Sequence, residues 1–219
     1  MNVPALSTAR LRICALGAGD RELFHELYGD AETMRFVGRP ASRGENNASF
    51  RATLEATRKP RGPRFFTIFK KRDGVAIGLC SIRRISVRGR SAEIGIMLAS
   101  RARGYGYALE SRRAFIDALF QTLPIDTIWV QNHKSNTDVA RLNARLGFSE
   151  TDSWRPPGVR RGWCVRVLTR SKWSLANRGN EGALPIGAVC RQYLPANAVV
   201  ARRQGTPCGD PYDANNPIN

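Results

Sequence analysis

The sequence EIGIMLASRARGYGYA, residues 93–108, decides the fold of this chain. Its first half is typical of a strand, and after Gly104 the pattern becomes helical. A glycine-containing turn that opens a helix presents unpaired N–H groups at the positive end of the helix dipole. Glycines also let a phosphate approach the backbone closely, and Arg101 and Arg103 add positive charge. The stretch therefore predicts a diphosphate cradle between a strand and a helix.

The segments on either side of this stretch predict an α+β fold. Apolar periodicity and turn residues predict a strand over 8–16, a helix from a cap at Asp20, a short helix over 30–36, a loop over 39–44 and a helix from about Asn47 to Arg58. Three antiparallel strands follow, RFFTIFKKRDG, VAIGLCSIRRISVRGR and SAEIGIMLAS, and then a helix to about residue 121, a strand over 127–131, a helix over 136–146 and two final strands. One β-α-β unit in this order requires a parallel strand pair.

The length and composition indicate one domain with additional chain behind it. The chain has 219 residues, and 42% of them are hydrophobic, which excludes a wholly disordered protein. Residues 1–173 hold all the periodic segments. Residues 174–219 show no sustained period, so we expect them to form an irregular or disordered tail.

The net charge of +17 predicts anionic partners. Only four arginines and three acidic residues follow Trp173, so the charge belongs to the first 173 residues. Between Arg51 and Arg113 there are 16 basic and four acidic residues. Such a surface is either simply solvated or a platform for RNA, the ribosome or an acidic substrate.

Several kinds of protein are disfavoured by the remaining composition. The five cysteines show no metal-binding spacing, and Cys14, Cys80 and Cys164 lie in apolar runs, where buried thiols are expected. Two histidines do not suffice for a histidine-rich metal site, so we expect no metal. No apolar run approaches the roughly 20 residues that span a bilayer, and no secretory signal is evident. We therefore expect a reduced, cytoplasmic protein without a membrane partner.

The pattern Arg101-x-x-Gly104-x-Gly106 resembles the acyl-CoA pyrophosphate motif of the GNAT-superfamily N-acetyltransferases. The flanking AEIGIML and GYGYALESRRAFIDALF are similar to the family's fourth strand and following helix, and NTDVARLNARLGF, residues 136–148, to its second CoA-side motif. The opening LSTARLRICALGAGDRELFHELYGDAETMRFVG resembles the branch of the ribosomal-protein N-terminal (Rim-type) acetyltransferases. The resemblance covers residues 6–173.

The resemblance implies a mixed, twisted sheet of about seven strands, flanked by four or so helices and splayed between the family's fourth and fifth strands. Acetyl-CoA, as co-substrate, would lie in that gap. Met97, Leu98 and Ala99 would pair with the pantetheine like an added strand, and Asn136 would contact the cofactor from the far side. The diphosphate would be held around the turn, by Arg101, Arg103, Gly104, Tyr105, Gly106, Tyr107 and Ala108.

The implied reaction is direct transfer of an acetyl group to a primary amine. Glu93 is the candidate base, acting directly or through water, and the alternative is a structural Glu93 paired with an arginine. The sequence departs from the family at two positions. Asn143 stands where many members have a tyrosine as general acid, and Val139 stands where a serine is common. The general acid is therefore unassigned.

Two classes of function remain open. In the first, the amine is a protein N-terminus or a small molecule, and we favour the N-terminus because a polycationic acceptor needs acidic residues, which are few here. A free α-amine, with a pKa of about 7.7–8.0, also needs little help to lose its proton. In the second, the chain is a catalytically idle module of the same fold that binds CoA or nucleic acid as a regulator.

Overall fold

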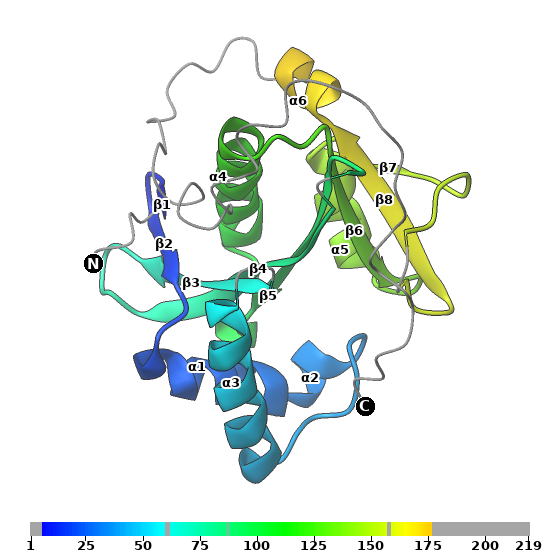
Figure 1. Cartoon of the computed structure of the whole chain (residues 1–219). Coiled ribbons are helices and arrows are strands. Elements are labelled where there is room, and N and C mark those ends of the chain that lie inside the picture. Colours follow the sequence, from blue (N-terminus) through cyan, green and yellow to red (C-terminus); the bar gives the residue numbers. More distant parts are fainter. Residues whose placement is uncertain (1–5, 60–61, 87, 157–158, 177–219) are drawn as a thin grey trace.

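The computed structural model describes residues 6–59, 62–86, 88–156 and 159–176 (Figure 1). The strands are β1 (Leu6–Ser7), β2 (Leu11–Ala15), β3 (Arg64–Lys70), β4 (Ala76–Ser86), β5 (Ser91–Leu98), β6 (Thr127–His133), β7 (Ser149–Glu150) and β8 (Trp163–Thr169). The α-helices are α1 (Arg21–Gly29), α2 (Ala31–Met34), α3 (Arg43–Arg58), α4 (Tyr107–Thr122), α5 (Thr137–Arg145) and α6 (Arg170–Ala176). Short 3-10 helices cover Ala18–Asp20 and Ser100–Ala102.

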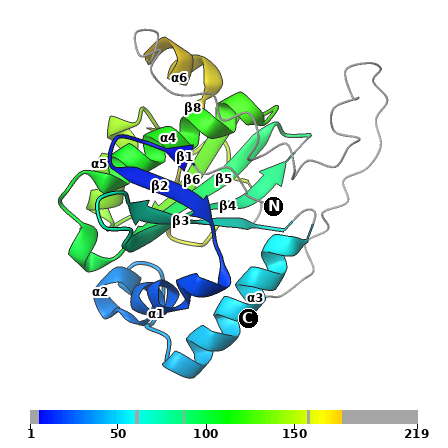
Figure 2. The ribbon, with the colours of Figure 1, turned by 90° about the vertical axis from the view of Figure 1, so that its left-hand side faces the viewer.

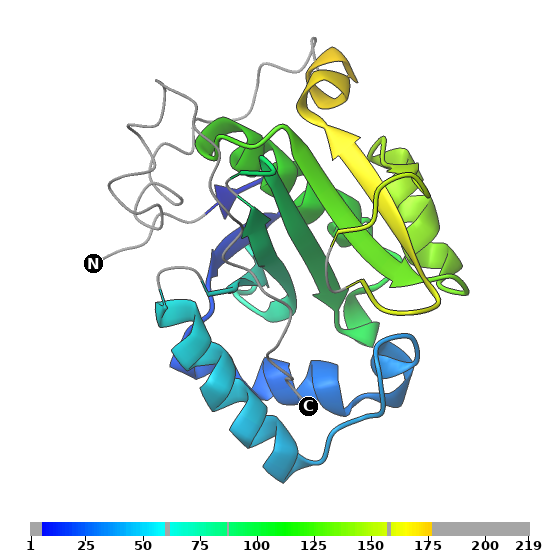
Figure 3. The same cartoon turned by 45° about the vertical axis from the view of Figure 1, so that its right-hand side comes forward.

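The eight strands of the described residues form one sheet in the order β1-β2-β3-β4-β5-β6-β8-β7. Every neighbouring pair is antiparallel except β5 and β6, which are parallel. That parallel pairing covers only Ser91–Glu93 against Thr127–Trp129, whereas β6 pairs with β8 along its whole length. Figure 3 shows β6 and β8 side by side. The expected α+β architecture with a splayed sheet is confirmed, with eight strands instead of about seven.

Helices cover both faces of the sheet (Figure 2). The larger hydrophobic core lies on the α4 side, where Phe115, Ile116 and Leu119 pack against the strands. The smaller core lies on the opposite face, under α1 and α3, and includes Phe24 and Phe50. The strands of a sheet point alternate side chains to these two faces, which is why both faces of the central strands are apolar.

Three expected boundaries were wrong. The strand expected over 8–16 covers only Leu11–Ala15 (β2) and pairs with the short β1 before it. Thr8 turns the chain between them, through hydrogen bonds from its backbone N–H to the Leu11 carbonyl and from the Leu11 N–H to its hydroxyl. The helix expected from Asn47 begins at Arg43, where Ser42 and Glu45 form a capping box. The last expected strand, GWCVRVLTRSKW (residues 162–173), ends at Thr169, and residues 170–173 form the start of α6.

The expected tail lies almost wholly outside the described residues, because only 174–176 are described and these belong to α6. Of the three cysteines expected to be buried, Cys80 and Cys164 are buried and Cys14 is only half-buried. Complete burial raises the pKa of the Cys80 thiol to about 12. None of the described helices is long and apolar enough to cross a membrane.

Candidate active site

The turn between β5 and α4 has the backbone geometry that phosphate binding needs. Gly104 and Gly106 have φ values of +82° and +79°, a region that glycine adopts without strain. The first hydrogen bond of α4 runs from the Glu110 N–H to the Gly106 carbonyl, 3.1 Å. The N–H groups that precede it, from Gly106 onward, have no acceptor within the helix. These N–H groups and the helix dipole form a site for an anion.

A cavity of about 640 Å³ lies beside this turn, between β5, α4, α5 and α2. Its apolar wall includes Ile96, Leu98, Leu109 and Leu142. Eight of the residues predicted to bind the cofactor line it: Met97, Leu98, Arg103, Gly104, Gly106, Tyr107, Ala108 and Asn136.

The edge of β5 that faces this cavity carries unused backbone groups. Beyond Glu93, no described strand pairs with β5 on the β6 side, while its other edge pairs with β4 up to Leu98. An extended ligand with amide groups can hydrogen-bond to such an edge as an added strand does. This geometry fits a pantetheine arm, and the turn described above fits the diphosphate.

Three of the predicted cofactor residues lie away from the cavity lining. Ala99 is buried and donates its N–H to the Ile77 carbonyl. The Arg101 guanidinium binds Glu26 on α1, with Nε 2.7 Å from Oε1. Tyr105 is 63% exposed, and its carbonyl accepts a hydrogen bond from Arg10.

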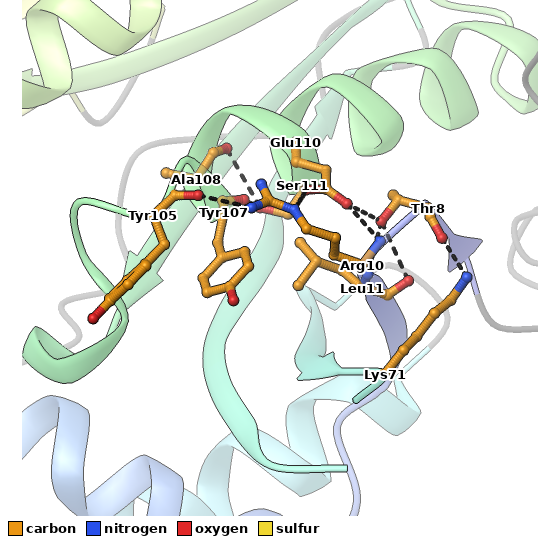
Figure 4. Close-up of polar contacts among 9 residues, drawn as sticks. All are labelled: Thr8, Arg10, Leu11, Lys71, Tyr105, Tyr107, Ala108, Glu110 and Ser111. Atoms are coloured by element: carbon orange, nitrogen blue, oxygen red, sulfur yellow. Dashed lines mark hydrogen bonds and ion pairs between the residues drawn. The ribbon is translucent and has the colours of Figure 1, made fainter. Parts of the chain in front are cut away.

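Arg10 connects the N-terminal hairpin to the glycine turn (Figure 4). Its Nη1 lies 3.1 Å from the Tyr105 carbonyl, its Nε lies 2.7 Å from Glu110 Oε2, and its guanidinium covers the Tyr107 ring at 4.7 Å. Burial raises the pKa of Glu110, but hydrogen bonds from Thr8 and Arg10 outweigh it and lower the pKa overall. Arg10 was not identified from the sequence, since Glu110 is 100 residues away.

Glu93 is buried at the point where β5 and β6 part. Its Oε2 accepts a hydrogen bond from Arg84 Nη1 at 3.1 Å, and its Oε1 accepts one from Gln131 Nε2 at 3.0 Å. The Gln131 Oε1 in turn accepts from the backbone N–H of Arg160, whose Nη1 donates to the Val37 carbonyl. A chain of hydrogen bonds thus joins Glu93 to the segments that follow β7 and α2.

Helix α2 and the turn after it supply a wall of the cavity that the sequence did not reveal, through Glu32, Thr33, Arg35, Phe36 and Val37. Asp30 caps this helix and also accepts a hydrogen bond from Ser100, beside the glycine turn, at 2.8 Å. The hydroxyl of Thr33, then that of Ser100, lowers the pKa of Asp30 to about 2. Arg103 donates to Thr33 from the other side, so α2 and the turn are tied together.

Helix α5 closes the cavity from the far side. Asn136 caps it by accepting a hydrogen bond from the Val139 N–H, and Arg141 and Arg145, four residues apart, line the cavity. Asn143 is completely buried and donates to Asn132 Oδ1 at 3.4 Å instead of lining the cavity. An amide in that position cannot supply a proton to a leaving thiolate.

Aromatic side chains lie on the Glu93 face of the sheet. His133, the last residue of β6, stacks on Phe36 with ring centroids 5.8 Å apart and meets Trp163 edge-on. The buried Trp129 contacts Trp154 edge-on. Among the described residues, no group of three His, Cys, Asp or Glu side chains is placed to hold a metal ion.

Comparison with known proteins gives three results. A family model described as the acetyltransferase (GNAT) domain matches residues 10–149. The FsC-acetyl coenzyme A-N(2)-transacetylase of Aspergillus fumigatus is 26% identical over 185 residues, covering 78% of each chain. Among solved structures, the ribosomal L7/L12 acetyltransferase RimL in complex with CoA has a TM-score of 0.65 at 14% identity, covering 77% of this chain and 99% of that one. Spermidine N-acetyltransferase from Vibrio cholerae has a TM-score of 0.62 at 22% identity, covering 76% and 99%.

Proposed function

Because the chain belongs to the GNAT family of N-acetyltransferases, we propose that it transfers the acetyl group of acetyl-CoA directly to a primary amine. The observation that carries the proposal is the cavity at the parting of β5 and β6, with the N-terminus of α4 at one side. This cavity offers an anion site, an unpaired strand edge and apolar walls, which match the diphosphate, the amide-containing arm and the thioester of acetyl-CoA.

In the proposed reaction, the amine nitrogen attacks the thioester carbonyl, a C–N bond forms and the C–S bond breaks. The thiolate of CoA leaves and takes a proton from water. Glu93 takes up the proton that the nitrogen loses, through water, because its carboxylate lies several residues along β5 from Met97. Both oxygens of Glu93 accept hydrogen bonds, but a carboxylate has about four acceptor positions, so a water can bind as well.

The acceptor would enter from the face of the sheet that bears Glu93, between the segments after α2 and after β7. Arg160 connects these two segments over Gln131. We favour a protein N-terminus over a small amine. RimL, which shares the fold, is a ribosomal-protein N-acetyltransferase, and the spermidine enzyme acts on a small amine, so the fold accommodates both classes.

The proposal is tested by incubating the protein with acetyl-CoA and a panel of amines and measuring released thiol. We expect thiol release with at least one amine, and CoA binding by calorimetry. In Glu93→Gln, we expect kcat to fall by about 10²-fold or more and the shape of the pH–rate profile to change. Binding of CoA should stay within about twofold, which separates loss of the base from misfolding. An unchanged pH–rate profile would show that Glu93 is structural.

The catalytically idle module has one observation in its favour, the buried Asn143 at the position where many family members have a tyrosine. Calorimetric binding of CoA without thiol release from any amine would support that reading. Failure to bind CoA would refute acetyl transfer and the idle module that binds CoA, and would leave only the module that binds nucleic acid.

A further inference from the structure

Strand β4 contains a bulge that places two consecutive arginines on one face of the sheet. Its register against β5 shifts between Ile82, which pairs with Ile94, and Arg84, which pairs with Glu93, so Arg83 is an extra residue without a pairing partner. In a regular strand, neighbouring side chains point to opposite faces, but a bulge redirects one of them. Arg83 and Arg84 are both exposed.

The contacts of the two arginines show that they share a face. Arg84 Nη1 binds Glu93, and a Cβ placed on Gly95 would lie 3.9 Å from Arg83 Cδ. Glu93, Gly95 and Met97 are alternate residues of β5, so they point to the same face. Arg83 therefore lies beside Gly95, halfway along β5 between Glu93 and Met97, and Met97 lines the cavity.

The charge of Arg83 is not neutralised by the described part of the protein. Arg83 forms no hydrogen bond or ion pair with the described residues, whereas Arg84 is paired with Glu93. Four carboxylates on α1, α2 and α3 are already ion-paired with other arginines, namely Glu22, Glu26, Glu32 and Glu45. Burial raises the pKa of Tyr28 on α1, and the positive charge of Arg83 opposes this rise, which places the guanidinium near that helix.

We propose that Arg83 recognises a carboxylate on the acceptor, so that the enzyme prefers amines carrying a carboxylate a few bonds from the nitrogen. This inference rests on the proposed acetyl transfer and names its substrate class. An acceptor that reaches the thioester beside Met97 lies next to Arg83. A carboxylate on the acceptor can bind the unpaired Arg83 guanidinium, whereas the positive charges of a polyamine are repelled by it. Two sources supply this chemistry: the acidic N-terminus of a protein, and a free amino acid.

The experiment measures kcat/KM by thiol release with matched acceptors. The peptides Ser-Asp-Glu-Ala and Ser-Asn-Gln-Ala, with amidated C-termini, have nearly the same shape and differ in charge, and Ser-Lys-Lys-Ala carries the opposite charge. β-Alanine and its amide test the free amino acid, and spermidine tests the polyamine. We expect the acidic peptide or β-alanine to exceed its neutral counterpart by about tenfold or more. The ratio of kcat/KM for the acidic acceptor to that for its neutral counterpart is compared between the peptides and β-alanine, and the larger ratio shows whether a protein N-terminus or a free amino acid is preferred. Raising the salt from 0.05 to 0.5 M should reduce that ratio.

Variants separate recognition by Arg83 from a general effect of positive charge. In Arg83→Ala, the advantage of the acidic acceptor should fall by about tenfold while kcat/KM for the neutral acceptor stays within about twofold. Arg83→Lys should keep part of the advantage. Arg72→Ala, which removes the same charge from the turn after β3, should keep all of it.

The possible results test carboxylate recognition and acetyl transfer separately. Equal or faster turnover of neutral acceptors or spermidine, or an equal loss on all acceptors in Arg83→Ala, would overturn the recognition of a carboxylate. If no acceptor is acetylated, the acetyl-transfer proposal fails. Calorimetric binding of the same peptides to the CoA-loaded protein then still decides the inference, because acidic peptides should bind more tightly than basic ones and Arg83→Ala should remove the difference.

Discussion

Replacing Arg10 with alanine should weaken acetyl-CoA binding without slowing the chemistry. The guanidinium forms two hydrogen bonds that alanine cannot, to Glu110 at 2.7 Å and to the Tyr105 carbonyl at 3.1 Å. Its side chain is half exposed, so each bond is discounted to about 0.5 kcal/mol. Together they amount to roughly 1 kcal/mol, or about fivefold in an equilibrium constant.

The fold should survive this change, because Glu110 keeps its hydrogen bonds from the Thr8 hydroxyl and from the backbone N–H of residue 10 (Figure 4). The effect should therefore appear as an approximately fivefold rise in the KM for acetyl-CoA and in the Kd for CoA. We expect kcat, and the KM for the amine, to stay within about twofold.

Arg12→Ala is the matched control, because it removes the same charge from β2, where the Arg12 guanidinium lies over the Phe69 ring at 5.2 Å and away from the glycine turn. If both variants weaken CoA binding equally, the general positive field is responsible and the positioning role is refuted. An unchanged KM in Arg10→Ala, or a loss in kcat alone, would also refute it.

Three further predictions concern stability and reactivity. The folded-state pKa of Asp30 is lowered to about 2, so its carboxylate stabilises the protein above the unfolded pKa of about 4, and this stabilisation is lost as the pH falls through about 2. In urea unfolding at pH 4, 3 and 2, the free energy of unfolding should therefore fall more steeply in the wild type than in Asp30→Asn. Parallel curves for the two proteins would contradict the assignment. Gly78→Ala should lower the free energy of unfolding by about 1–3 kcal/mol, because a Cβ there would lie 2.4 Å from the Met97 carbonyl oxygen. Gly44→Ala on α3 is the control and should be neutral or stabilising, because a Cβ there would have no atom within 4 Å. Equal thermal stability of the two variants would argue against a close approach of β4 and β5. Burial raises the pKa of the Cys80 thiol to about 12, so Cys80 should resist alkylation at pH 8 until guanidinium unfolds the protein. Peptide mass analysis measures the modification. If Cys80 in the native protein were modified as fast as the half-buried Cys14, Cys80 would not be buried in the core.

Local signals in the sequence were sufficient for the centre of the fold. The change from strand to helix around Gly104 and Gly106 depends on residues that are neighbours in the chain, and the cap at Asn136 likewise lies next to the helix that it begins. The start of α3 also has a local signal, since Ser42 and Glu45 have the capping-box spacing, and it lies four residues before the predicted start at Asn47.

Features that depend on distant partners could not be predicted in this way. Arg101 was expected at the cofactor because it lies beside the turn, but Glu26 on α1 binds its guanidinium. The contact between Arg10 and Glu110 spans 100 residues. The bulge at Arg83 exists only in the pairing of β4 with β5, and the sequence of β4 alone reads as a continuous strand. The roles of Glu93 and of the cofactor residues remain predictions.

The short parallel contact between β5 and β6 has a mechanical consequence. Three residue pairs, Ser91–Glu93 with Thr127–Trp129, join a five-strand half of the sheet to a three-strand half. Hydrogen bonding across the seam stops at the Glu93–Trp129 pair. A ligand that hydrogen-bonds to β5 while contacting α5 would hold the two halves of the sheet together. Amide hydrogens on both sides of the seam should then exchange more slowly with solvent in the loaded protein, so the substrate would itself complete the sheet that binds it.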